Sequence, residues 1–424
     1  MSFDNLPRGW QLIPLEDAMD AIIDYRGKTP KKTESGIPLI TAKIVKGGYV
    51  LEPFEFIAED NYDSWMVRGL PQVGDVVLTT EAPLGEIAQL TSANVALAQR
   101  IVTLRGKKGL LDSDFLLCAL QSDFVQHQLE SRASGSTVKG IKQSELRKVS
   151  LPIPPLLEQH KISQVLKSLS NKLVCNTKTN QILEEMAQAI FKSWFVDFDP
   201  VKAKMSGEQP EGMDAATASL FPEKLVESEL GFIPEGWEVD SLSSVVDVIM
   251  GQSPKGTTYN DQNVGTPLVN GPVEFGVYHP VAQKWTTAPT KLSKDKDLIV
   301  CVRGSTTGRY VVSDGEYCLG RGVCSVRSDD YPAFANYLFK SQLNNLLILT
   351  TGSTFPSWSG PTLKHFKVVV PPKSIIEKYE AIVGNLCSMM AQNTGENESL
   401  ASLRDMLLPK LFSGEIELDK VLDV

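Results

Sequence analysis

The sequence predicts a mixed α/β (α+β) protein in which two globular domains stand in a pseudo-twofold arrangement and are joined by a two-helix antiparallel coiled coil. Three observations predict this fold. The second half of the 424-residue chain repeats the first. Each half ends in a long segment with a heptad pattern of apolar residues. Each half also has short β-rich runs before an amphipathic segment, which is typical of compact mixed domains.

The internal repeat consists of short motifs that recur in the same order. In the later part of each half the spacing is constant, since 352 − 135 and 371 − 154 both give 217. A period of this length indicates duplicated domains, not a solenoid. The motifs and their second copies are Pro7-Arg8-Gly9-Trp10 and Pro234-Glu235-Gly236-Trp237, Gly27-Lys28-Thr29-Pro30 and Gly251-Gln252-Ser253-Pro254, Gly74-Asp75-Val76-Val77-Leu78 and Lys296-Asp297-Leu298-Ile299-Val300, Ser134-Gly135-Ser136-Thr137 and Thr351-Gly352-Ser353-Thr354, and Pro154-Pro155 and Pro371-Pro372.

The segment after each Pro-Pro pair carries residues spaced alternately by four and three, which is the a/d seam of a coiled coil. The first seam is Ile162, Leu166, Leu169, Leu173, Asn176, Asn180, Leu183, Ala187, Ile190 and Trp194. Adding 217 gives the second: Tyr379, Val383, Leu386, Met390, Asn393, Asn397, Leu400, Arg404, Leu407 and Leu411.

The central asparagines of the two seams, Asn176, Asn180, Asn393 and Asn397, predict how the helices pair. Buried asparagine lowers stability but fixes register and partner orientation. In an antiparallel pair, the asparagine layers of one helix fall opposite those of the other. The alternative is that each helix packs only on its own domain, with its asparagines facing solvent.

These signals divide the chain into five segments. Pro155 and Pro372 suit a first helical turn, and Asp197-Phe198-Asp199-Pro200 and Ser413-Gly414 are helix stop signals. The stretch between the halves is rich in Gly, Pro, Ala, Ser and charge, which is typical of a linker with at most a short helix. The expected segments are a first domain over 1–154, a helix over 155–200, a linker over 201–230, a second domain over 231–371 and a helix over 372–424.

Within the domains, apolar runs and periodicity predict individual elements. Strands are expected at 37–40, 76–80, 101–104, 298–302, 323–326 and 368–370. Amphipathic helices are expected near 113–130 and 333–349.

Composition limits the class of protein. The hydrophobic content of 42% is enough for two or three ordinary cores. No apolar run reaches the length of a membrane span, and the N-terminus lacks a signal-peptide pattern, so we expect a cytoplasmic protein. The six cysteines form no CxxC pair, which indicates reduced thiols. Cys301, Cys318 and Cys324 with His279 lack the paired close spacings of structural zinc sites.

Catalytic motifs are missing from the sequence. It contains no GxxxxGK[ST] loop, no Asn-Pro-Pro-Tyr or Asp-Pro-Pro-Tyr tetrapeptide and no HExxH, so an NTPase, an N6-methyltransferase and a zincin are not supported. Asp197 and Asp199 near Lys202 suggest a metal-dependent nuclease, although two acids at a helix end are more often exposed stop residues. We expect no catalytic residue, no metal and no cofactor.

The motifs together resemble the specificity (S) subunit of type I restriction-modification systems over essentially the whole chain. Those that carry the resemblance are the two Pro-x-Gly-Trp openings, the Gly-Lys-Thr-Pro and Gly-Gln-Ser-Pro turns, Gly-Asp-Val-Val-Leu, Gly-Ser-Thr, Ile153-Pro154-Pro155-Leu156-Leu157-Glu158-Gln159 and Phe191-Lys192-Ser193-Trp194-Phe195. One departure is that Glu81-Ala82-Pro83-Leu84-Gly85 stands where the second half has Arg303-Gly304-Ser305-Thr306-Thr307-Gly308. A basic contact assigned to Arg303 therefore does not transfer to Glu81.

The resemblance implies a non-catalytic subunit with two target-recognition domains, each reading one half of a bipartite, asymmetric double-stranded DNA target. It implies that the helices form the antiparallel coiled coil and bind two methyltransferase (M) subunits. It also implies restriction/translocase (R) subunits, with the partners supplying S-adenosylmethionine-dependent adenine methylation, ATP-driven translocation and cleavage.

The net charge of −9, from 51 acidic and 42 basic residues, contrasts with the basic footprint of a free-standing DNA binder. We therefore expect weak DNA binding by the chain alone. Basic residues in loops are the candidates for contacts to guanine or phosphate. Trp358, beside Pro356 and Gly360, fits a lid over a local core equally well. The nucleic-acid-binding candidates are Arg26, Lys28, Lys43, Arg100, Lys139, Lys142, Lys255, Arg303, Arg309, Arg321 and Trp358.

Two other classes of protein remain open from the residues. One is a nuclease or methyltransferase fused to a binding module. The other is a duplicated scaffold or carbohydrate-binding protein without DNA specificity, in which the helices serve only dimerisation. Copurification with a methyltransferase subunit separates both from the leading interpretation.

Overall fold

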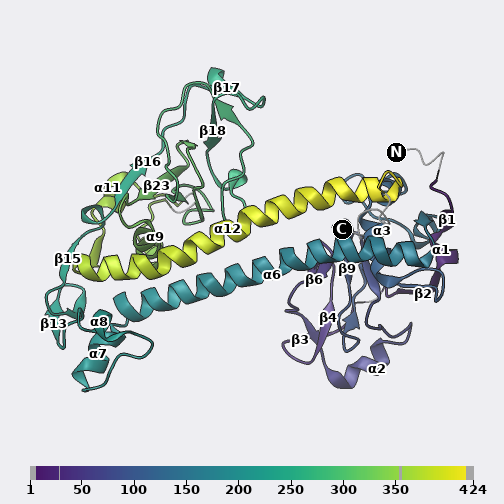
Figure 1. Cartoon of the computed structure of the whole chain (residues 1–424), viewed down its shortest axis with the longest axis horizontal. Helices are drawn as coiled ribbons and strands as arrows, with labels where there is room; N and C mark the ends of the chain where they lie inside the picture. The colour runs from purple at the N-terminus through teal and green to yellow at the C-terminus, as the bar shows by residue number, and fades with distance from the viewer. Residues whose placement is uncertain (1–5, 28, 353–355, 417–424) are drawn as a thin grey trace. The chain divides into compact units, whose positions relative to one another are not determined.

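The computed structural model describes residues 6–27, 29–352 and 356–416 (Figure 1). The chain forms two compact units, one of residues 1–175 with 397–424 and the other of residues 176–396. Two helices of 40 residues each, α6 (Leu156–Phe195) and α12 (Lys373–Phe412), contribute one part to each unit. The predicted mixed α/β class with two globular domains and long helices is confirmed.

The globular part of the first unit is built on two four-stranded sheets. One is antiparallel, in the order β2-β11-β8-β9, and the other, β10-β4-β7-β3, contains the parallel pair β10 and β4. A separate pair, β1 (Gln11–Pro14) and β12 (Ser150–Ile153), joins the start of the unit to the start of α6. The sheet strands are β2 Met19–Asp24, β3 Lys32–Thr33, β4 Ile37–Ile40, β7 Phe56–Ile57, β8 Val76–Thr80, β9 Leu84–Gln89, β10 Ala96–Leu97 and β11 Ile101–Gly106, with the hairpin β5 Val45–Lys46 and β6 Tyr49–Val50 beside them.

One predicted helix of this unit is two helices. The periodicity predicted a helix near 113–130, and the structure has α3 (Ser113–Gln121) and α4 (Asp123–Ser131). Ser122 adopts an extended conformation between them, and its hydroxyl accepts the N–H of Val125, which caps α4. A capping serine therefore interrupts a continuous apolar pattern. The short helices are α1 Leu15–Ala18, α2 Tyr62–Trp65, α5 Gln143–Leu146 and the 3-10 turn η1 Glu59–Asn61.

The second unit repeats this topology. Its antiparallel sheet has the order β16-β23-β20-β21, and its mixed sheet, β17-β19-β18-β22, again has one parallel pair, β18 and β22. The pair β15 (Glu238–Ser241) and β24 (Lys367–Val370) corresponds to β1 and β12. The sheet strands are β16 Asp247–Met250, β17 Tyr259–Asn260, β18 Thr266–Val269, β19 Trp285–Thr286, β20 Leu298–Cys301, β21 Tyr310–Val312, β22 Cys318–Leu319 and β23 Val323–Arg327.

The helices of the second unit follow the same plan. The segment predicted as one helix near 333–349 is α9 (Pro332–Ser341) and α10 (Leu343–Ile348), which meet at Gln342. The core of the unit contains aromatic side chains of α6, α9 and α12, with Phe195 and Tyr379 at 5.2 Å between ring centroids. The remaining short elements are α11 Gly360–Lys364, η2 Leu242–Ser244, η3 Gly256–Thr258 and η4 Pro272–Glu274.

The segment predicted as a linker, 201–230, is more structured than its composition indicates. It contains most of α7 (Asp199–Met205), all of α8 (Ala215–Ala218) and the strand β13 (Leu225–Ser228), which pairs with β14 (Gly231–Pro234). Val201 and Phe221 are buried in the core of the second unit. A few apolar residues in a polar segment are enough to hold it against the domain, and a composition average conceals them.

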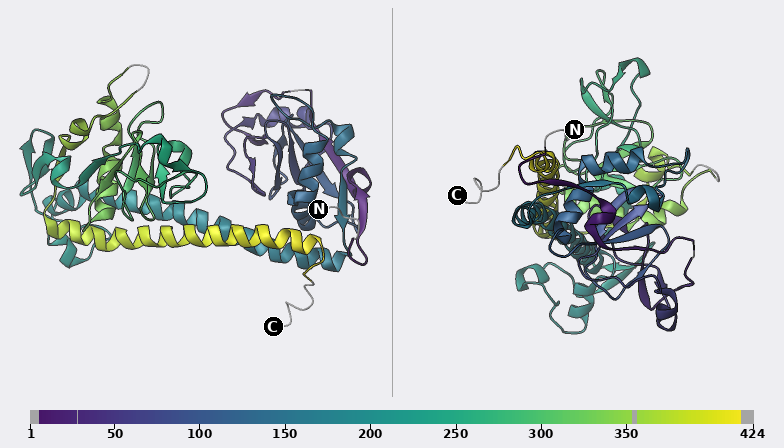
Figure 2. Two further views of the ribbon diagram at one scale, coloured as in Figure 1. Left: turned by 90° about the horizontal axis from the view of Figure 1, so that it is seen from above. Right: turned by 90° about the vertical axis from the view of Figure 1, so that its right-hand side faces the viewer.

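In each unit the two long helices run antiparallel, and α6 and α12 lie side by side (Figure 2). In the second unit, the Ala187 carbonyl oxygen lies 3.4 Å from the Tyr379 hydroxyl, and Asn180 meets Asn393. In the first, Ile162 and Leu166 share a core with Leu408 and Leu411. None of the predicted seam positions is exposed.

The helix starts differ slightly from the prediction. α6 and α12 begin one residue after Pro155 and Pro372, so each proline is an N-cap and not a member of the first turn. The carbonyl of Pro155 accepts the N–H of Glu158, and that of Pro372 accepts the N–H of Ile375. Both helices end where the stop signals predicted, at Phe195 and Phe412.

The two tryptophans of the repeated Pro-x-Gly-Trp motif lie in matching cores with unequal partners. The indole of Trp10 donates to Glu158 Oε1 at 3.0 Å. The buried Nε1 of Trp237 has no hydrogen-bond partner among the described residues, because Ile375 stands at the position of Glu158 (375 − 158 = 217). The two units therefore share the indole ring but differ by one hydrogen bond.

We therefore expect Trp10→Phe to lower the free energy of unfolding by about 1–2 kcal/mol more than Trp237→Phe, because it alone leaves Glu158 unpaired. Urea unfolding of the two variants and the parent chain measures the difference. Equal losses would show that the indole–carboxylate bond contributes nothing net.

Candidate functional site

Three predicted arginines lie at one end of the antiparallel sheet of the second unit. Arg303 follows β20, Arg309 precedes β21 and Arg321 precedes β23, and all three are exposed. The backbone holds these strand ends together, since the N–H of Val302 donates to the Gly322 carbonyl at 2.9 Å and that of Cys301 to the Arg309 carbonyl at 2.8 Å. The fold thus gathers three cations that are up to 18 residues apart in sequence (321 − 303).

Two loops support this sheet end. Arg303 bridges to Ser357, and the N–H of Gly304 donates to the Pro356 carbonyl at 2.9 Å. The N–H of Arg321 donates to Ser253 Oγ at 3.1 Å, which holds the loop that carries the exposed Lys255. Lys255 therefore belongs to the same end of the unit.

Trp358, predicted as a nucleic-acid contact, does not lie among these exposed side chains but is buried in the core. The side chain is 2% exposed, and its indole N–H donates to the Leu346 carbonyl at 2.7 Å. The ring packs edge-on against Phe339. Trp358 is a core residue under the loop, as the alternative interpretation of its Pro and Gly neighbours held.

The first unit places Arg100, Lys139 and Lys142 at the equivalent sheet end. The N–H of Thr80, at the end of β8, donates to the Arg100 carbonyl at 3.0 Å, and the next residue, Glu81, bridges to Gly140. All three cationic residues are exposed. Glu81 is the positional equivalent of Arg303 (303 − 81 = 222), and its carboxylate lies 3.9 Å from Arg100 Nε. The two sheet ends therefore differ in charge at matching positions.

The other predicted residues of the first unit have different settings. The Arg26 guanidinium is held by Asp24 at 2.9 Å and by the Ile141 carbonyl at 2.7 Å, so it braces the loop before α5. Lys43 is exposed, lies 3.3 Å from Glu55 and sits over the Phe54 ring. Lys28 lies outside the described residues.

Sequence reasoning missed a polar hollow of about 420 Å³ beside Arg26, lined also by Asp24, Arg68 and Gln143. Arg68 Nη1 donates to the carbonyls of Asp24 and Arg26. In the second unit, Met250 stands in place of Arg26 (250 − 26 = 224), and a Cβ on Gly360 would meet Met250 Cγ at 3.1 Å. Gly360 itself stands at the position of Gln143 (360 − 143 = 217). A comparison of the two halves of the sequence therefore shows that two residues lining the hollow have no equivalent in the second unit.

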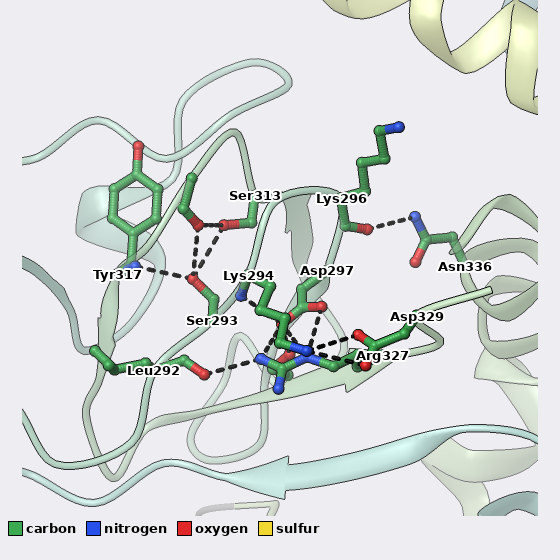
Figure 3. A network of polar contacts seen from close by, with 12 residues as sticks. Leu292, Ser293, Lys294, Lys296, Asp297, Ser313, Tyr317, Arg327, Asp329 and Asn336 are labelled. Carbon is green, nitrogen blue, oxygen red and sulfur yellow. Dashed lines mark hydrogen bonds and ion pairs between the residues drawn. The ribbon is translucent and has the colours of Figure 1, made fainter. Parts of the chain in front are cut away.

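The opposite end of each antiparallel sheet is closed by an ion pair with a buried aspartate, and Figure 3 shows the pair of the second unit. Arg327 donates to both carboxylate oxygens of Asp297, with Nη2 to Oδ2 at 2.7 Å, and its Nη2 also donates to the Leu292 carbonyl. Asp75 and Arg105 make the same contacts in the first unit, at 2.8 Å, with Leu70 in place of Leu292. Hydrogen bonding to Asp297 raises the pKa of Arg327. The pair fixes the strands that carry the candidate residues at their other end.

The central asparagines of the seam are hydrogen-bonded within their units. Asn393 donates to Asn180 Oδ1 at 2.8 Å, and Asn180 donates to the Met390 carbonyl at 3.0 Å. Asn176 donates to Glu396 Oε2 at 2.7 Å, and Asn397 contacts the Leu173 carbonyl at 3.4 Å. The solvent-facing alternative for these residues does not hold, since none of the four is exposed.

The residues considered for catalysis or metal binding are dispersed. Asp197 pairs with Lys192, and Asp199 begins α7. Burial raises the pKa of the Cys301 thiol to about 11 and that of Cys324 to about 12, so both are neutral thiols. Across residues 6–27, 29–352 and 356–416, His, Cys, Asp and Glu form no group of three or more arranged to hold a metal ion. No helix in these ranges has the length and apolar character needed to cross a bilayer.

Comparison with known proteins gives consistent matches. The model of the type I restriction modification DNA specificity domain matches residues 7–185 and again 234–400. The chain is 24% identical to the putative type I restriction enzyme MjaX specificity subunit of Methanocaldococcus jannaschii, covering 97% of this chain and 94% of that protein. It is 26% identical to the HindI specificity subunit of Haemophilus influenzae, covering 76% and 82%. The crystal structure of a type I restriction-modification S subunit from M. genitalium has a similar fold, with a TM-score of 0.57 at 16% identity, covering 97% and 98%.

Proposed function

Because the chain belongs to the type I restriction-modification DNA specificity family, as a DNA sequence-recognition subunit whose catalytic partners are separate, we propose how its two units divide the recognition. Each unit reads one half of a bipartite double-stranded DNA target with the end of its antiparallel sheet. The observation that carries this proposal is the pair of topologically equivalent sheet ends, each bearing exposed cations. Exposed guanidinium groups contact phosphates and guanine edges.

The two half-sites differ in sequence under this proposal, because the sheet ends differ in chemistry. The first offers Arg100 beside Glu81, and the second offers Arg303, Arg309 and Arg321 without an acidic residue at the matching position. Carboxylates accept from cytosine N4, whereas arginine donates to guanine O6 and N7. An asymmetric target follows from this substitution of Glu81 for Arg303.

The partners proposed from the family are two methyltransferase subunits on the long helices, together with restriction/translocase subunits. Exposed apolar side chains on both helices support a protein-binding role: Ile182 (57% exposed) and Met186 (47%) on α6 in the second unit, and Leu403 (40%) and Met406 (58%) on α12 in the first. Met186 and Leu403 are equivalent positions (403 − 186 = 217), as two copies of one binding surface require. Large exposed apolar residues on a helix are typical of protein interfaces.

The proposal is tested by co-expressing the chain with the methyltransferase subunit of its own system and mapping methylated adenines in the host DNA. We expect copurification of the two proteins and one bipartite methylated sequence, with no methylation by either protein alone. Turnover of DNA by the chain alone, lost on replacing Asp197 or Asp199, would instead support the nuclease alternative. Failure to copurify would support the scaffold alternative.

Arg303→Ala is expected to weaken target binding by the complex by about 1–3 kcal/mol if the guanidinium reads a base, or to lower the salt slope by about one if it contacts a phosphate. Fluorescence anisotropy at several salt concentrations distinguishes the two. Lys294→Ala, at the opposite end of the same sheet and paired with Asp329 at 2.9 Å, is the matched control and should leave both quantities unchanged. An Arg303→Ala complex with unaltered affinity and slope would contradict this assignment.

A further inference from the structure

A cavity of about 240 Å³ in the second unit lies apart from the sheet end proposed to contact DNA. Its walls come from α9, from α12 and from the turn before β20. Asn336, 6% exposed, lines it, and the Asn336 carbonyl oxygen has no hydrogen-bond partner among the described residues. Its amide nitrogen donates to the Lys296 carbonyl at 3.2 Å, which fixes the oxygen's orientation (Figure 3). A buried acceptor without a donor is costly, and it indicates a group that supplies one.

The first unit has a hollow of about 300 Å³ at the equivalent place, lined by residues that include Asp114, Ser163 and Lys167. There, Lys167 of α6 reaches Asp114 at the start of α3, with Nζ 2.7 Å from Oδ2. In the second unit, Gly384 takes the place of Lys167 (384 − 167 = 217) and Ala333 that of Asp114 (333 − 114 = 219). Both replacements line the cavity. The second cavity thus occupies the space in which the first unit holds an alkylammonium chain.

The acceptors in the second unit are new relative to the first. Glu380 replaces Ser163 (380 − 163 = 217), and Asn336 replaces Leu117 (336 − 117 = 219). The Glu380 carboxylate accepts the N–H groups of Ala333 and Phe334 at 3.1 and 2.9 Å, and burial raises its pKa. The remaining oxygen lone pairs of Glu380 face the space beside Gly384, where a Cβ would meet Oε1 at 3.3 Å. The cavity therefore has Glu380 and Asn336 where the first unit has Ser163 and Leu117, and it lacks the ion pair of Lys167 with Asp114.

The other polar groups of the cavity leave room for a cation. The Lys340 ammonium is already held by Glu184 at 2.9 Å and lies over the Tyr337 ring. Burial raises the pKa of the Cys387 thiol to about 11 and also raises that of Tyr278, so both side chains are neutral. His279 Nδ1 is engaged with the Val312 carbonyl. Asp295 and Lys296 are exposed residues of the lining, and the Lys296 side chain points away from the Asn336 oxygen (Figure 3).

We propose that this cavity binds the primary ammonium end of a linear alkylamine, which donates to the Asn336 carbonyl oxygen and to the Glu380 carboxylate and lies along the space vacated by the lysine. Tyr278 supplies an aromatic wall, which favours a cation. The ligand joins α9 to α12 and thereby stabilises the second unit. Two sources carry this chemistry, a free polyamine and the lysine side chain of another protein. The proposal is independent of the proposed DNA contacts.

The test is calorimetric titration of the full chain with spermidine and, separately, with Nα-acetyl-lysine methylamide. We expect saturable binding with one site per chain and a rise in the Tm of the second unit. Binding of spermidine alone identifies a free polyamine, and binding of the lysine amide identifies a lysine side chain. The absence of saturable binding by both probes would overturn the proposal.

Variants of the cavity residues distinguish amine binding at this site from nonspecific electrostatic attraction of an amine to the acidic chain. Ala333→Asp with Gly384→Lys rebuilds the pair of the first unit and should weaken binding by at least about tenfold. Asn336→Leu replaces the acceptor by leucine, the residue at the equivalent position of the first unit, and should also weaken binding. This single variant still tests the proposal if the double variant misfolds. Lys296→Asn removes the nearest exposed cation and should tighten binding, since asparagine tolerates the left-handed backbone (φ 69°) at this position.

The matched control widens the equivalent hollow in the first unit. Asp112→Asn, Asp114→Ala and Lys167→Gly together remove its lysine and both of its carboxylates, and Asn keeps a capping side chain before α3. This variant should gain no second site. A second binding site in this variant would show that the amines bind wherever a cavity is large enough. Binding that survives in both second-unit variants, Ala333→Asp with Gly384→Lys and Asn336→Leu, would show that the amines are attracted by the surface charge of the chain. Either outcome would overturn the proposal.

Discussion

Asp297→Ala is expected to lower the free energy of unfolding of the second unit by about 3–5 kcal/mol, because it leaves the Arg327 guanidinium, whose side chain is only 14% exposed, without its counter-ion. Asp297 is 4% exposed and accepts from Arg327, from Ser325 Oγ at 2.6 Å and from the Lys294 N–H at 2.8 Å. All three donors lose this shared acceptor at once, although Arg327 Nη2 keeps its hydrogen bond to the Leu292 carbonyl. Chemical unfolding, followed by a probe specific to each unit, measures the loss and assigns it to the second unit.

The control lies within the same network (Figure 3). Lys294 and Asp329 form an ion pair whose side chains are 57% and 66% exposed, so Asp329→Ala should change stability by less than about 1 kcal/mol. Asp75→Ala should reproduce the large loss in the first unit, where Arg105 makes the same contacts. If Asp297→Ala and Asp329→Ala lowered the free energy of unfolding equally, the ion pair of Asp297 with Arg327 would not stabilise the sheet.

Most features of the fold that could be predicted from the sequence were predicted from its internal repeat. Motif pairs at constant spacing predicted two equivalent domains. The heptads predicted both long helices, and Pro155 and Pro372 predicted their starts to within one residue. Helix interruptions were missed because Ser122 and Gln342 lie inside apolar patterns that continue on either side. The linker was misjudged because Val201 and Phe221 are isolated apolar residues, whose burial depends on a surface that only the folded unit provides.

The candidate site was predicted less completely than the fold. Residue type and loop position predicted the exposed arginines at the sheet end of the second unit, because exposed strand ends tolerate charged side chains. The same criteria gave Trp358, whose burial depends on Leu346 and Phe339 from other elements. Arg68 was missed because it donates to the backbone carbonyls of Asp24 and Arg26, 44 and 42 residues earlier in the chain, and belongs to no repeated motif.

The asparagine layer of the helices allows a test of register. Asn180→Leu alone should lower the free energy of unfolding of the second unit by about 1–3 kcal/mol, because it leaves the Asn393 amide without its acceptor. Asn393→Leu should cost less, since Asn180 keeps its bonds to the Met390 carbonyl and to Thr394 Oγ1 at 3.2 Å. The double variant should recover most of the loss, because an apolar layer replaces both partners together. A double-mutant cycle in urea measures this coupling.

Stability alone does not establish a role in register, so the variants also need a functional measurement. Apolar layers tolerate sliding that an asparagine pair opposes. Under the proposed function, the double variant should therefore methylate targets over a wider range of half-site spacings, with the half-site bases unchanged. Asn385→Leu is the control on the same helix, since Asn385 is exposed and its amide donates only to the Ala381 carbonyl of its own helix. A double variant that keeps both the parent stability and the parent spacing would show that this layer does not set the register, and altered half-site bases would show that the helices act on recognition itself.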